Sequence, residues 1–520
     1  MDLFSNLLAI SGVIALLLLI KLWKRPHHNE KMAKLVPEIP GGIPILGHMH
    51  LLRDKQNLGR IFGGFADKYG PIFSVRLGKC RAVFISDKPG IKDCFINNDI
   101  NIASRPPSTQ AQFLGYDNSS FGFAPYGRFW RDIRKLATVE LLSGRRIKML
   151  NYIPISELNH LMRDLYNNST GNNGSFKVDI TESFQRMVLN TITRMVAGKR
   201  VFDGNHLAEK AKGRNLSHII RELLDVTGQI VPGDVIPFIA WLDIKGVVKT
   251  MKNVCDEVGT LVDKWIEEHK MNTNKNEDEK DFIDVMLSEV TNYEEMGLDQ
   301  SAIIKGTATS IIIGASDTTA ISITWILSNL MNHPKVLKRC QEELDLKVGK
   351  DRIVQVEDIE KLEYLSAVIK ETLRLYPAGP IGTPRIVTED CYMSGYFVPK
   401  GCYLFINIWK VHRDPNLWSN PEEFKPERFL NEKAHLDITG NSYEYLPFSA
   451  GRRSCPGNYF AMHIMNLSLA RFLQGFNVAT PNNQPVDMTE GQNIVMQKEY
   501  NLELVLTPRL DPKLYELDCN

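Results

Sequence analysis

A single cysteine, Cys455, lies between a turn rich in small and basic residues and a run with helical spacing, in the stretch PFSAGRRSCPGN. The run CPGNYFAMHIMNLSLARFLQGF repeats apolar residues every three or four positions, which predicts a helix with Pro456 in its first turn. Unpaired backbone N–H groups at the start of a helix, together with its dipole, favour a thiolate over a thiol. The chain therefore has to fold around a stabilised sulfur anion, which suits nucleophilic attack or metal binding.

The surroundings of Cys455 favour a metal ligand whose other partners come from a cofactor. His463 lies two turns further along the same predicted helix, so nothing brings it back to activate a nucleophile. The eight cysteines are scattered without a C-x-x-C pair, which argues against a structural zinc site. A haem supplies four nitrogen ligands itself, and Arg453 is available to pair with a haem propionate. A buried structural cysteine after a turn is the plain alternative.

The same stretch carries the motif F-x-x-G-x-R-x-C-x-G, which resembles the cysteine signature of the cytochrome P-450 haem-thiolate monooxygenases. All five fixed positions are present: Phe448, Gly451, Arg453, Cys455 and Gly457. The resemblance implies a haem b with the Cys455 thiolate as its axial metal ligand. It also implies that Phe448, Arg453 and Gly457 bind the cofactor, and that Gly451 lets the backbone pass close to it.

A second motif, KETLRLYP, places Glu371 and Arg374 three residues apart on one helix face. Taken alone, such a pair is an ordinary surface ion pair that contributes little to stability. The resemblance adds a third member, Arg428, from the segment PERF. In the family these residues form a buried triad beneath the haem-binding loop, so we expect them to have a structural role.

The segment TSIIIGASDTTAISITWILSNL, residues 309–330, is apolar on almost all sides and predicts a buried helix. Thr318 lies four residues after Gly314, so its hydroxyl can bond that carbonyl and loosen the helix. Taken alone, the segment is equally well a packed core helix with satisfied hydroxyls. It resembles the family's oxygen-activation motif, which implies that Asp317 and Thr318 are catalytic. Ala315 replaces the motif's second glycine, and its methyl group is expected to narrow the groove slightly.

Two further patterns point to the haem propionates by resemblance. FAPYGRFWRDIRKLA contains Trp130 and Arg134 about one helical turn apart, and TPRIVTED contains Arg385. The resemblance implies that Trp130, Arg134 and Arg385 bind the cofactor. Without it, the first pattern is an amphipathic basic helix, and a lone arginine in a strand is usually on the surface.

The whole chain predicts a membrane anchor followed by one mostly α (α+β) domain. Residues 1–24 contain an uncharged apolar stretch long enough to span a bilayer, followed by basic residues that stay in the cytosol. Residues 25–47 are basic and rich in proline and glycine, which predicts a hinge. Residues 48–520 would form the haem-thiolate catalytic domain, with two early strands, PIFSVRLG and RAVFIS. The resemblance implies the cytochrome P-450 fold with small β-sheets, preceded by one transmembrane helix, in the endoplasmic reticulum membrane with its catalytic domain in the cytosol.

The chain has 62 Lys and Arg against 61 Asp and Glu, a balance that gives no support to nucleic-acid binding. With no G-x-G-x-x-G unit in the sequence, electrons would come from a partner. The resemblance implies that this partner is a membrane-bound, NADPH-dependent flavoprotein reductase and that the reaction uses O2. The basic face from Trp130 to Lys135, with Arg452, is a candidate docking surface or simply a solvated face.

Several stretches resemble the plant microsomal members, most of all the plant family numbered eighty-two: IASRPPS, FGFAPYGRFWR, PFIAWLD and PFSAGRRSCPG. Members of that family oxidise alkaloids, terpenoids, coumarins and flavonoids. The resemblance implies a pocket for a small hydrophobic molecule, which suits mainly apolar stretches. These stretches are residues 110–123, 226–231, 307–313, 378–383 and 493–497.

Among these substrates an alkaloid is favoured, oxidised by hydroxylation, demethylation or a ring closure such as tropinone formation. Asp117 or Asp225 could meet its basic nitrogen, although acids in loops usually face water. A terpenoid, coumarin or flavonoid hydroxylase is the alternative. Two rivals of other classes are a reductase-independent haem-thiolate isomerase or dehydratase and a non-catalytic haem carrier. Isomerases of this family usually lack the acid and threonine that are present here as Asp317 and Thr318.

Overall fold

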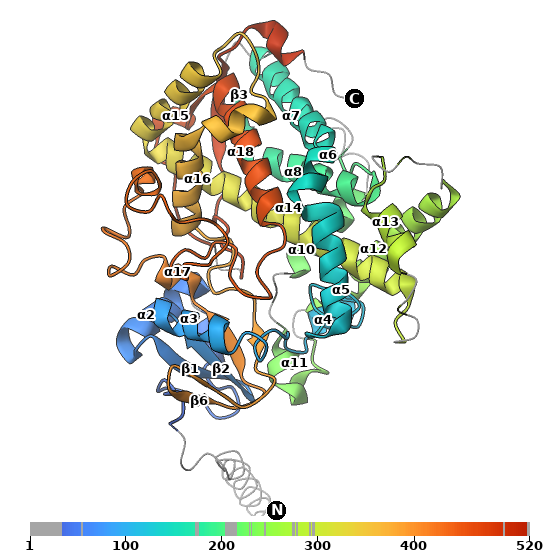
Figure 1. The fold of residues 1–520 in the computed structure, drawn as a ribbon, viewed down its shortest axis with the longest axis vertical. Coiled ribbons are helices and arrows are strands. Elements are labelled where there is room, and N and C mark those ends of the chain that lie inside the picture. The colour runs from blue at the N-terminus through green and yellow to red at the C-terminus, as the bar shows by residue number, and fades with distance from the viewer. Residues whose placement is uncertain are drawn as a thin grey trace, which may run out of the picture.

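The computed structural model describes residues 34–53, 56–171, 176–202, 216–227, 229, 231–243, 246–272, 276, 279–290, 293, 297–491 and 494–516. This part of the chain is mostly helical with small sheets, which confirms the predicted fold class (Figure 1). The predicted anchor, residues 1–24, lies outside the described residues.

The helices make up most of the molecule. They are α2 (Leu58–Tyr69), α3 (Lys88–Asn97), α4 (Thr109–Phe113), α5 (Arg128–Ala137), α6 (Gly144–Met149), α7 (Tyr152–Gly171), α8 (Ile180–Ala197), α10 (Leu216–Thr227), α11 (Pro232–Val235), α12 (Val247–Met271), α13 (Phe282–Glu289), α14 (Gln300–Asn332), α15 (Pro334–Lys347), α16 (Glu363–Leu375), α17 (Ile408–Val411) and α18 (Asn458–Gly475).

The strands of the described residues form three sheets, with orders β1-β2-β7-β4, β3-β9-β8 and β5-β6. They are β1 (Ile72–Leu77), β2 (Cys80–Ile85), β3 (Phe176–Asp179), β4 (Arg385–Ile386), β5 (Cys391–Met393), β6 (Tyr396–Val398), β7 (Tyr403–Ile406), β8 (Phe476–Ala479) and β9 (Glu503–Pro508). The antiparallel pair β1 and β2 confirms the two strands predicted early in the chain. Its turn contains Gly78 at φ +58°, a conformation that glycine adopts without strain.

Residues 34–47 of the predicted hinge pack against this first sheet. The backbone N–H of Ser74 in β1 donates to the Pro37 carbonyl over 2.7 Å, and the N–H of Ile39 donates to the Ser74 carbonyl over 3.1 Å. Val36 and Ile39 are buried. This part of the hinge is therefore joined to the folded body by strand-like hydrogen bonds, which proline and glycine content alone does not indicate.

Helix α14 runs through the middle of the molecule and packs against α8, α16 and α18 (Figure 1). Among the described residues it is the one helix long and apolar enough to cross a membrane, but 67% of its most apolar window is buried in the protein. It is thus the buried core helix that its sequence predicts. The Asp299 carboxylate caps its first turn by accepting from the Ala302 N–H over 2.8 Å.

Candidate functional site

Cys455 lies in a tight loop ahead of α18. Its backbone N–H donates to the Phe448 carbonyl over 2.9 Å, and the Ser454 N–H donates to the Gly451 carbonyl over 3.0 Å. Gly451 has a φ of +70°, and a Cβ at this position would lie 2.4 Å from Asp99 Oδ1. Glycine is therefore required here by backbone conformation and by the approach of Asp99.

Helix α18 begins at Asn458, so Pro456 precedes the helix and does not lie in its first turn as predicted. The Cys455 side chain is accessible although it lies deep in the fold, and burial raises the pKa of its thiol. The Gly457 backbone N–H and the charge of Arg134 act in the opposite direction. The backbone N–H donor predicted beside the sulfur is present. Without a metal on the sulfur, however, the burial of the thiol has the larger effect on its pKa. A metal cation on the sulfur would reverse this balance, because it deprotonates the thiol.

Four arginines gather near this loop: Arg105, Arg134, Arg385 and Arg453. Burial lowers the pKa of each, and the repulsion among them lowers the pKa of Arg105, Arg385 and Arg453 further. A guanidinium nevertheless stays charged in proteins, so the cluster carries several positive charges, with Asp99 as a nearby negative charge for Arg385. Among the described residues, its hydrogen-bond partners are backbone carbonyls and not carboxylates. Such a cluster fits a multiply anionic group, such as the two propionates of a haem.

The residues predicted to bind the propionates fall into two groups: Trp130 and Arg453 bond backbone carbonyls of residues 103–124, and Arg134 and Arg385 keep more free N–H groups. The Trp130 indole N–H donates to the Phe121 carbonyl over 2.9 Å. Arg453 donates to the same carbonyl over 3.0 Å and also to the carbonyls of Ala103 and Ala124. Its guanidinium carbon lies 4.3 Å from the centre of the Trp130 ring. These two side chains therefore hold the 103–124 backbone, which leaves Arg453 few donors for an anion.

Arg134 and Arg385 have more N–H groups left for an anion than Arg453 has. Arg134 Nη2 donates to the Ser454 carbonyl over 2.6 Å, beside Cys455. Arg385 Nη2 donates to the Ala450 carbonyl over 3.2 Å. Arg105, which sequence reasoning missed as a site residue, donates to the Pro384 carbonyl over 2.9 Å. The stretch IASRPPS contains this arginine, but only the folded chain brings it to the other three.

Helix α14 contains the hydrogen bond that its spacing predicts. The Thr318 hydroxyl donates to the Gly314 carbonyl over 2.8 Å. The helix nevertheless continues unbroken from residue 300 to 332, so this bond does not open it. A Cβ at Gly314 would meet nothing within 4 Å, whereas Ala315 packs against the hydrophobic core. The methyl group at 315 is thus used for packing.

Asp317 lies next to Thr318, and burial raises the pKa of its carboxyl to about 6. The negative charge of Asp225 on α10 is the second cause of this increase. A carboxyl group with this pKa exchanges its proton near neutral pH, as a general acid requires. Of the two acids considered for a basic nitrogen, Asp225 lies near enough to Asp317 to raise its pKa, whereas no such effect links Asp117 to Asp317, and both side chains are exposed.

Hydrogen bonds join the stretches predicted to line a pocket in two groups. Ser310 Oγ donates to Ser120 Oγ over 3.1 Å, which joins 307–313 to 110–123. The Gln110 amide donates to the Thr227 carbonyl over 2.7 Å, which adds 226–231. The Met496 N–H donates to the Ala378 carbonyl over 2.9 Å, so the last two stretches also meet. Residues 228, 230 and 493 of these stretches lie outside the described residues.

The structure brings the predicted triad together. Glu371 Oε2 accepts from Arg374 Nε over 2.8 Å, and Glu371 Oε1 accepts from Arg374 Nη2 over 2.9 Å. Arg428 Nε donates to Glu371 Oε1 over 3.2 Å. All three side chains are at most 1% exposed. Such a network stabilises a fold only when it is complete, because a lone buried charge is costly.

His412 connects this triad to the cysteine loop, and sequence reasoning did not single it out. Its Nδ1 lies 3.0 Å from the Arg374 carbonyl, and its Nε2 lies 2.7 Å from the Leu446 backbone nitrogen. The first contact requires Nδ1–H and the second a bare Nε2, so the ring is neutral. Burial and then the charge of Arg374 lower the pKa of His412 to about 3, which agrees with this tautomer.

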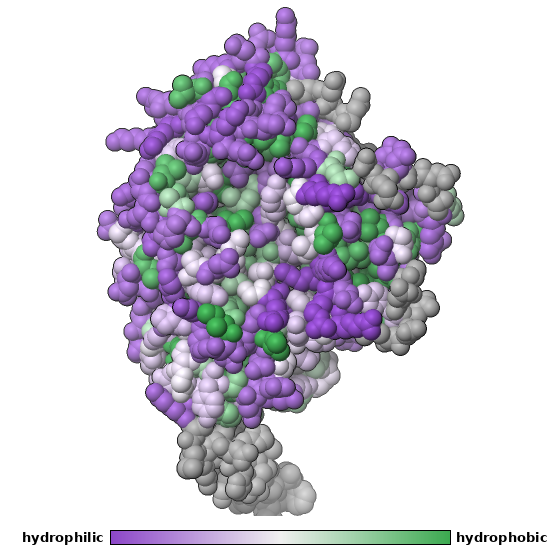
Figure 2. Space-filling model, viewed as in Figure 1, coloured by the Kyte–Doolittle hydropathy of each residue, from purple (hydrophilic) through white to green (hydrophobic). Residues whose placement is uncertain are grey.

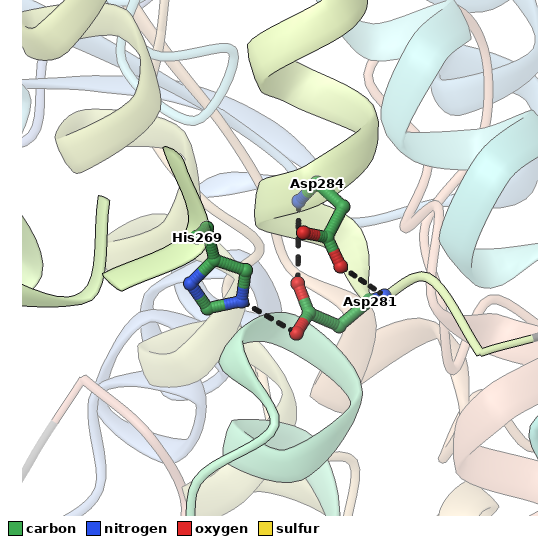
Figure 3. Close-up of side chains that lie close together, drawn as sticks. All are labelled: His269, Asp281 and Asp284. Carbon is green, nitrogen blue, oxygen red and sulfur yellow. Dashed lines mark hydrogen bonds and ion pairs between the residues drawn. The ribbon is translucent and has the colours of Figure 1, made fainter. Parts of the chain in front are cut away.

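Another group of potential ligands, His269, Asp281 and Asp284, lies between α12 and α13, with ligand atoms within 4.8 Å of one another (Figure 3). His269 Nδ1 lies 2.6 Å from the Trp265 carbonyl, and its Nε2 lies 2.7 Å from Asp281 Oδ2. Both neighbours accept, so both ring nitrogens carry protons and neither has a lone pair for a metal. Asp281 and Asp284 form the capping box of α13. This cluster is therefore a helix cap.

Comparison with known proteins agrees with the arrangement around Cys455. The family model of cytochrome P-450 matches residues 37–505, and this family uses a haem with a cysteine thiolate axial ligand. The chain is 42% identical over 517 residues to cytochrome P-450 CYP82J17 of Trigonella foenum-graecum, with 98% of each chain covered. This similarity confirms the predicted resemblance to the plant family numbered eighty-two.

Two further relatives have names that state an activity. Strychnine-10-hydroxylase of Strychnos nux-vomica is 41% identical over 516 residues, covering 98% of each chain. Flavonoid-6-hydroxylase of Mentha piperita is 40% identical over 521 residues, covering 99% of this chain and 100% of the relative.

Proposed function

The chain belongs to the cytochrome P-450 family of monooxygenases, and from this premise we propose that it oxidises a small, mostly hydrophobic alkaloid of plant specialised metabolism. The reaction uses O2 and electrons that originate from NADPH. The observation that carries the proposal is the meeting of an accessible Cys455 with arginines whose charge no described carboxylate pairs with. A thiolate ligand and an anion-binding cluster are what a haem requires.

In this proposal Cys455 ligates the haem iron, while Arg105, Arg134 and Arg385 pair with the propionates through their free N–H groups. The bound haem supplies the oxidising chemistry, to which the thiolate contributes electron density. Trp130 and Arg453 position the backbone of 103–124 beside it. The triad of Glu371, Arg374 and Arg428 supports the loop from below, acting through His412.

Asp317 and Thr318 of α14 would handle the protons of the reaction. Asp317 is half-buried and has a pKa of about 6, so both its protonation states are populated near neutral pH. Thr318 is partly exposed toward the groove, and its own proton is held by the Gly314 carbonyl over 2.8 Å. The hydroxyl oxygen therefore keeps its lone pairs free to accept a hydrogen bond, which would let it position a proton donor such as the protonated Asp317.

The electron donor in this proposal is an NADPH-dependent flavoprotein reductase. Figure 2 shows strongly hydrophilic residues gathered over α5 and α6. The exposed basic residues there are Arg128, Arg131, Lys135, Arg145 and Lys148. Helix α5 also carries Arg134, which bonds the Ser454 carbonyl beside Cys455. This basic surface would therefore steer an acidic partner to the cysteine side of the molecule.

The substrate class rests on charge as well as on similarity. Asp225 and Asp317 place two acidic groups at the α14 groove, where they would attract a protonated amine. The relative named for strychnine hydroxylation acts on an alkaloid, whereas the flavonoid hydroxylase supports the alternative of a phenolic substrate. The uncharged phenol gains no attraction between opposite charges from the two acids, and we therefore favour the amine.

Residues 1–24 would hold the enzyme in the endoplasmic reticulum membrane, with the catalytic domain in the cytosol. The apolar stretch is long enough to span a bilayer, and basic residues follow it. Fractionation of cells that express the full chain or a chain without residues 1–24 tests this proposal. A truncated chain that stays in the microsomal pellet to the same extent would contradict it.

One experiment tests the reaction class. The purified full chain, reduced and exposed to carbon monoxide, should give the absorption band of a thiolate-ligated haem. Product should then form only when both NADPH and reductase are present. Product without reductase would indicate the isomerase or dehydratase, and a haem spectrum without any product would indicate the carrier. A Cys455→Ala variant that kept its thiolate band and activity would overturn the assignment of the ligand.

A second experiment tests the substrate class. The enzyme and reductase are incubated with a panel of plant alkaloids, coumarins, flavonoids and terpenoids, and mass spectrometry reads gains of oxygen or losses of hydrogen or methyl groups. We expect turnover of an amine that is protonated at neutral pH. An Asp225→Asn variant should raise the KM for that amine while leaving the KM for neutral members unchanged. Turnover confined to neutral phenolics would contradict the alkaloid proposal.

A further inference from the structure

One face of α14 carries Ser310, Gly314 and Thr318 at intervals of four residues, so the three lie in a row. At a rise of about 1.5 Å per residue, Ser310 lies about 6 Å from Gly314 and about 12 Å from Thr318 along the helix axis. Gly314 is exposed and Thr318 partly so. Ser310 therefore extends the proposed oxygen-activation groove by one turn.

Ser310 is the exception in its stretch of the helix. Within 307–313 the other polar side chains, Thr307 and Thr309, are at most 2% exposed. Ser310 is partly exposed, and the remaining side chains of the stretch are apolar. It is therefore the hydroxyl that a molecule lying along this part of α14 can reach.

The chain segment opposite is built to approach this hydroxyl. Ser310 Oγ lies 3.1 Å from Ser120 Oγ, which is fully buried. A Cβ at Gly122 would lie 2.9 Å from Ser310 Oγ, and a Cβ at Gly306 would lie 3.1 Å from the Ser120 Cβ. Glycine at both positions lets the loop come close enough for the two hydroxyls to meet.

The hydroxyl pair has hydrogen-bonding capacity left over. Two hydroxyl groups carry two protons and four lone pairs, and the bond between them uses one proton and one lone pair. Ser310 is the donor in that bond, so the accessible Ser310 keeps two lone pairs that need partners, while the remaining proton belongs to the buried Ser120. A polar atom of a bound molecule can provide these partners where an apolar wall would leave them unmet.

We propose that the Ser310–Ser120 pair is a specificity-determining anchor in which Ser310 accepts a hydrogen bond from a hydroxyl group of the substrate. This inference rests on the proposed monooxygenase function and names a second recognition element besides the amine. It places the substrate hydroxyl about one helical turn from Gly314 and about two turns from Thr318. Substrates that lack the oxygen bind less tightly and are oxidised at more than one position.

The test uses the haem-loaded full chain and pairs of probes that differ by one oxygen: tropine and tropane, 7-hydroxycoumarin and coumarin, and 5-hydroxyflavone and flavone. Titration calorimetry gives the dissociation constant of each probe. We expect the wild type to prefer the hydroxylated member of at least one pair by about tenfold, the size of one good hydrogen bond. Ser310→Ala and the closely isosteric Ser310→Cys should both lose this preference.

Ser328→Ala is the matched control, because Ser328 is a fully buried serine of the same helix whose hydroxyl donates to the Thr324 carbonyl over 2.8 Å. It should keep the preference. If the serine pair only fastens the loop, the Ser310 variants would melt at lower temperature and bind both probes of a pair equally more weakly. Retention of the preference in both Ser310 variants, or its absence from every pair in the wild type, would overturn the proposal.

Regioselectivity provides an independent readout. With the substrate found in the panel, Ser310→Ala should yield a broader distribution of products while its carbon monoxide band stays unchanged. The binding preference can be measured without NADPH or reductase. A wild type that shows the preference but forms no product would therefore refute the proposed monooxygenase function while leaving the anchor intact.

Discussion

His412 Nε2 accepts a hydrogen bond from the Leu446 backbone N–H over 2.7 Å, two residues before the loop residue Phe448. The other ring nitrogen donates to the Arg374 carbonyl over 3.0 Å. A single fully buried imidazole thus joins the charged triad to the chain that leads to Cys455. The order of the loop depends on a residue that lies 43 positions away from the cysteine in the sequence.

Replacing His412 by Phe should destabilise the protein by about 2 kcal/mol or more. The phenyl ring fills the space but leaves the Leu446 N–H and the Arg374 carbonyl without a partner, at about 1–3 kcal/mol for each buried group. Urea denaturation of the haem-loaded enzyme measures this change. The exposed His435 provides the control, since His435→Phe should change stability by less than about 0.5 kcal/mol.

Replacing Glu371 by Ala should cost about 3–5 kcal/mol, because Arg374 and Arg428 would remain buried without their counter-charge. The variant should also lose haem more readily, since the triad supports the loop through His412. Thermal unfolding and haem retention on a desalting column measure the two effects. Glu342, which pairs with Lys338 over 3.6 Å on the surface, is the control. A Glu371→Ala variant as stable as Glu342→Ala would contradict the structural role.

Replacing Thr318 by Ala should lower product formation by about a hundredfold, the lower range of what a positioned proton carrier contributes. The carbon monoxide band and the melting temperature should stay close to wild type, because the hydroxyl bonds only a carbonyl of its own helix. Thr318→Ser restores a hydroxyl and should recover most of the rate. Equal activity of Thr318→Ala and the wild type would remove Thr318 from the proton path.

Local patterns predicted the parts of the site that lie within one element. The spacing of Thr318 and Gly314 predicted their hydrogen bond, and the spacing of Glu371 and Arg374 predicted their shared helix face. In each case one helical turn brings the partners together, so no tertiary information is required. That Arg428 joins this pair could be predicted only from the family resemblance, because its partner Glu371 lies 57 residues earlier in the chain.

Parts of the site that depend on distant segments could not be predicted in this way. Arg105 meets the Pro384 carbonyl 279 residues away, and neither periodicity nor a cap indicates that contact. The donors of Arg453 are used by the carbonyls of Ala103, Phe121 and Ala124, which a sequence motif does not reveal. The pKa of Cys455 likewise depends on burial, a property of the assembled fold.

Replacing Arg105 by Leu should speed haem loss about tenfold or more, because one charge-assisted hydrogen bond to a propionate contributes about 1.5–3 kcal/mol. Transfer of haem to excess apomyoglobin, followed by absorbance, measures the rate. Arg105→Lys keeps the charge and should retain part of the effect. The exposed Arg128 on α5 serves as the control, since its Leu variant should lose haem at the wild-type rate. Equal rates for the two Leu variants would exclude Arg105 from the cofactor site.

The pair of His269 and Asp281 should make stability depend on pH. Burial alone would lower the pKa of His269, but the hydrogen bond and charge of Asp281, with the Trp265 carbonyl, outweigh it and raise the pKa. A histidine whose pKa is raised in the folded protein stabilises it fully at pH values below the pKa of the unfolded state, which is about 6.5. This stabilisation is lost as the pH rises through the pKa of the folded state.

We therefore expect the free energy of unfolding of the wild type to fall as pH rises above about 6.5. In a His269→Gln variant this fall should be smaller, because the glutamine amide can still bond Asp281 but does not titrate. Urea titrations from pH 6 to pH 9 with both proteins measure the difference in slope. The exposed His435→Gln variant should follow the wild type. Parallel curves for the wild type and His269→Gln would mean that the imidazole is not charged in the folded protein, and the cap would then rest on the carboxylates of α13 alone.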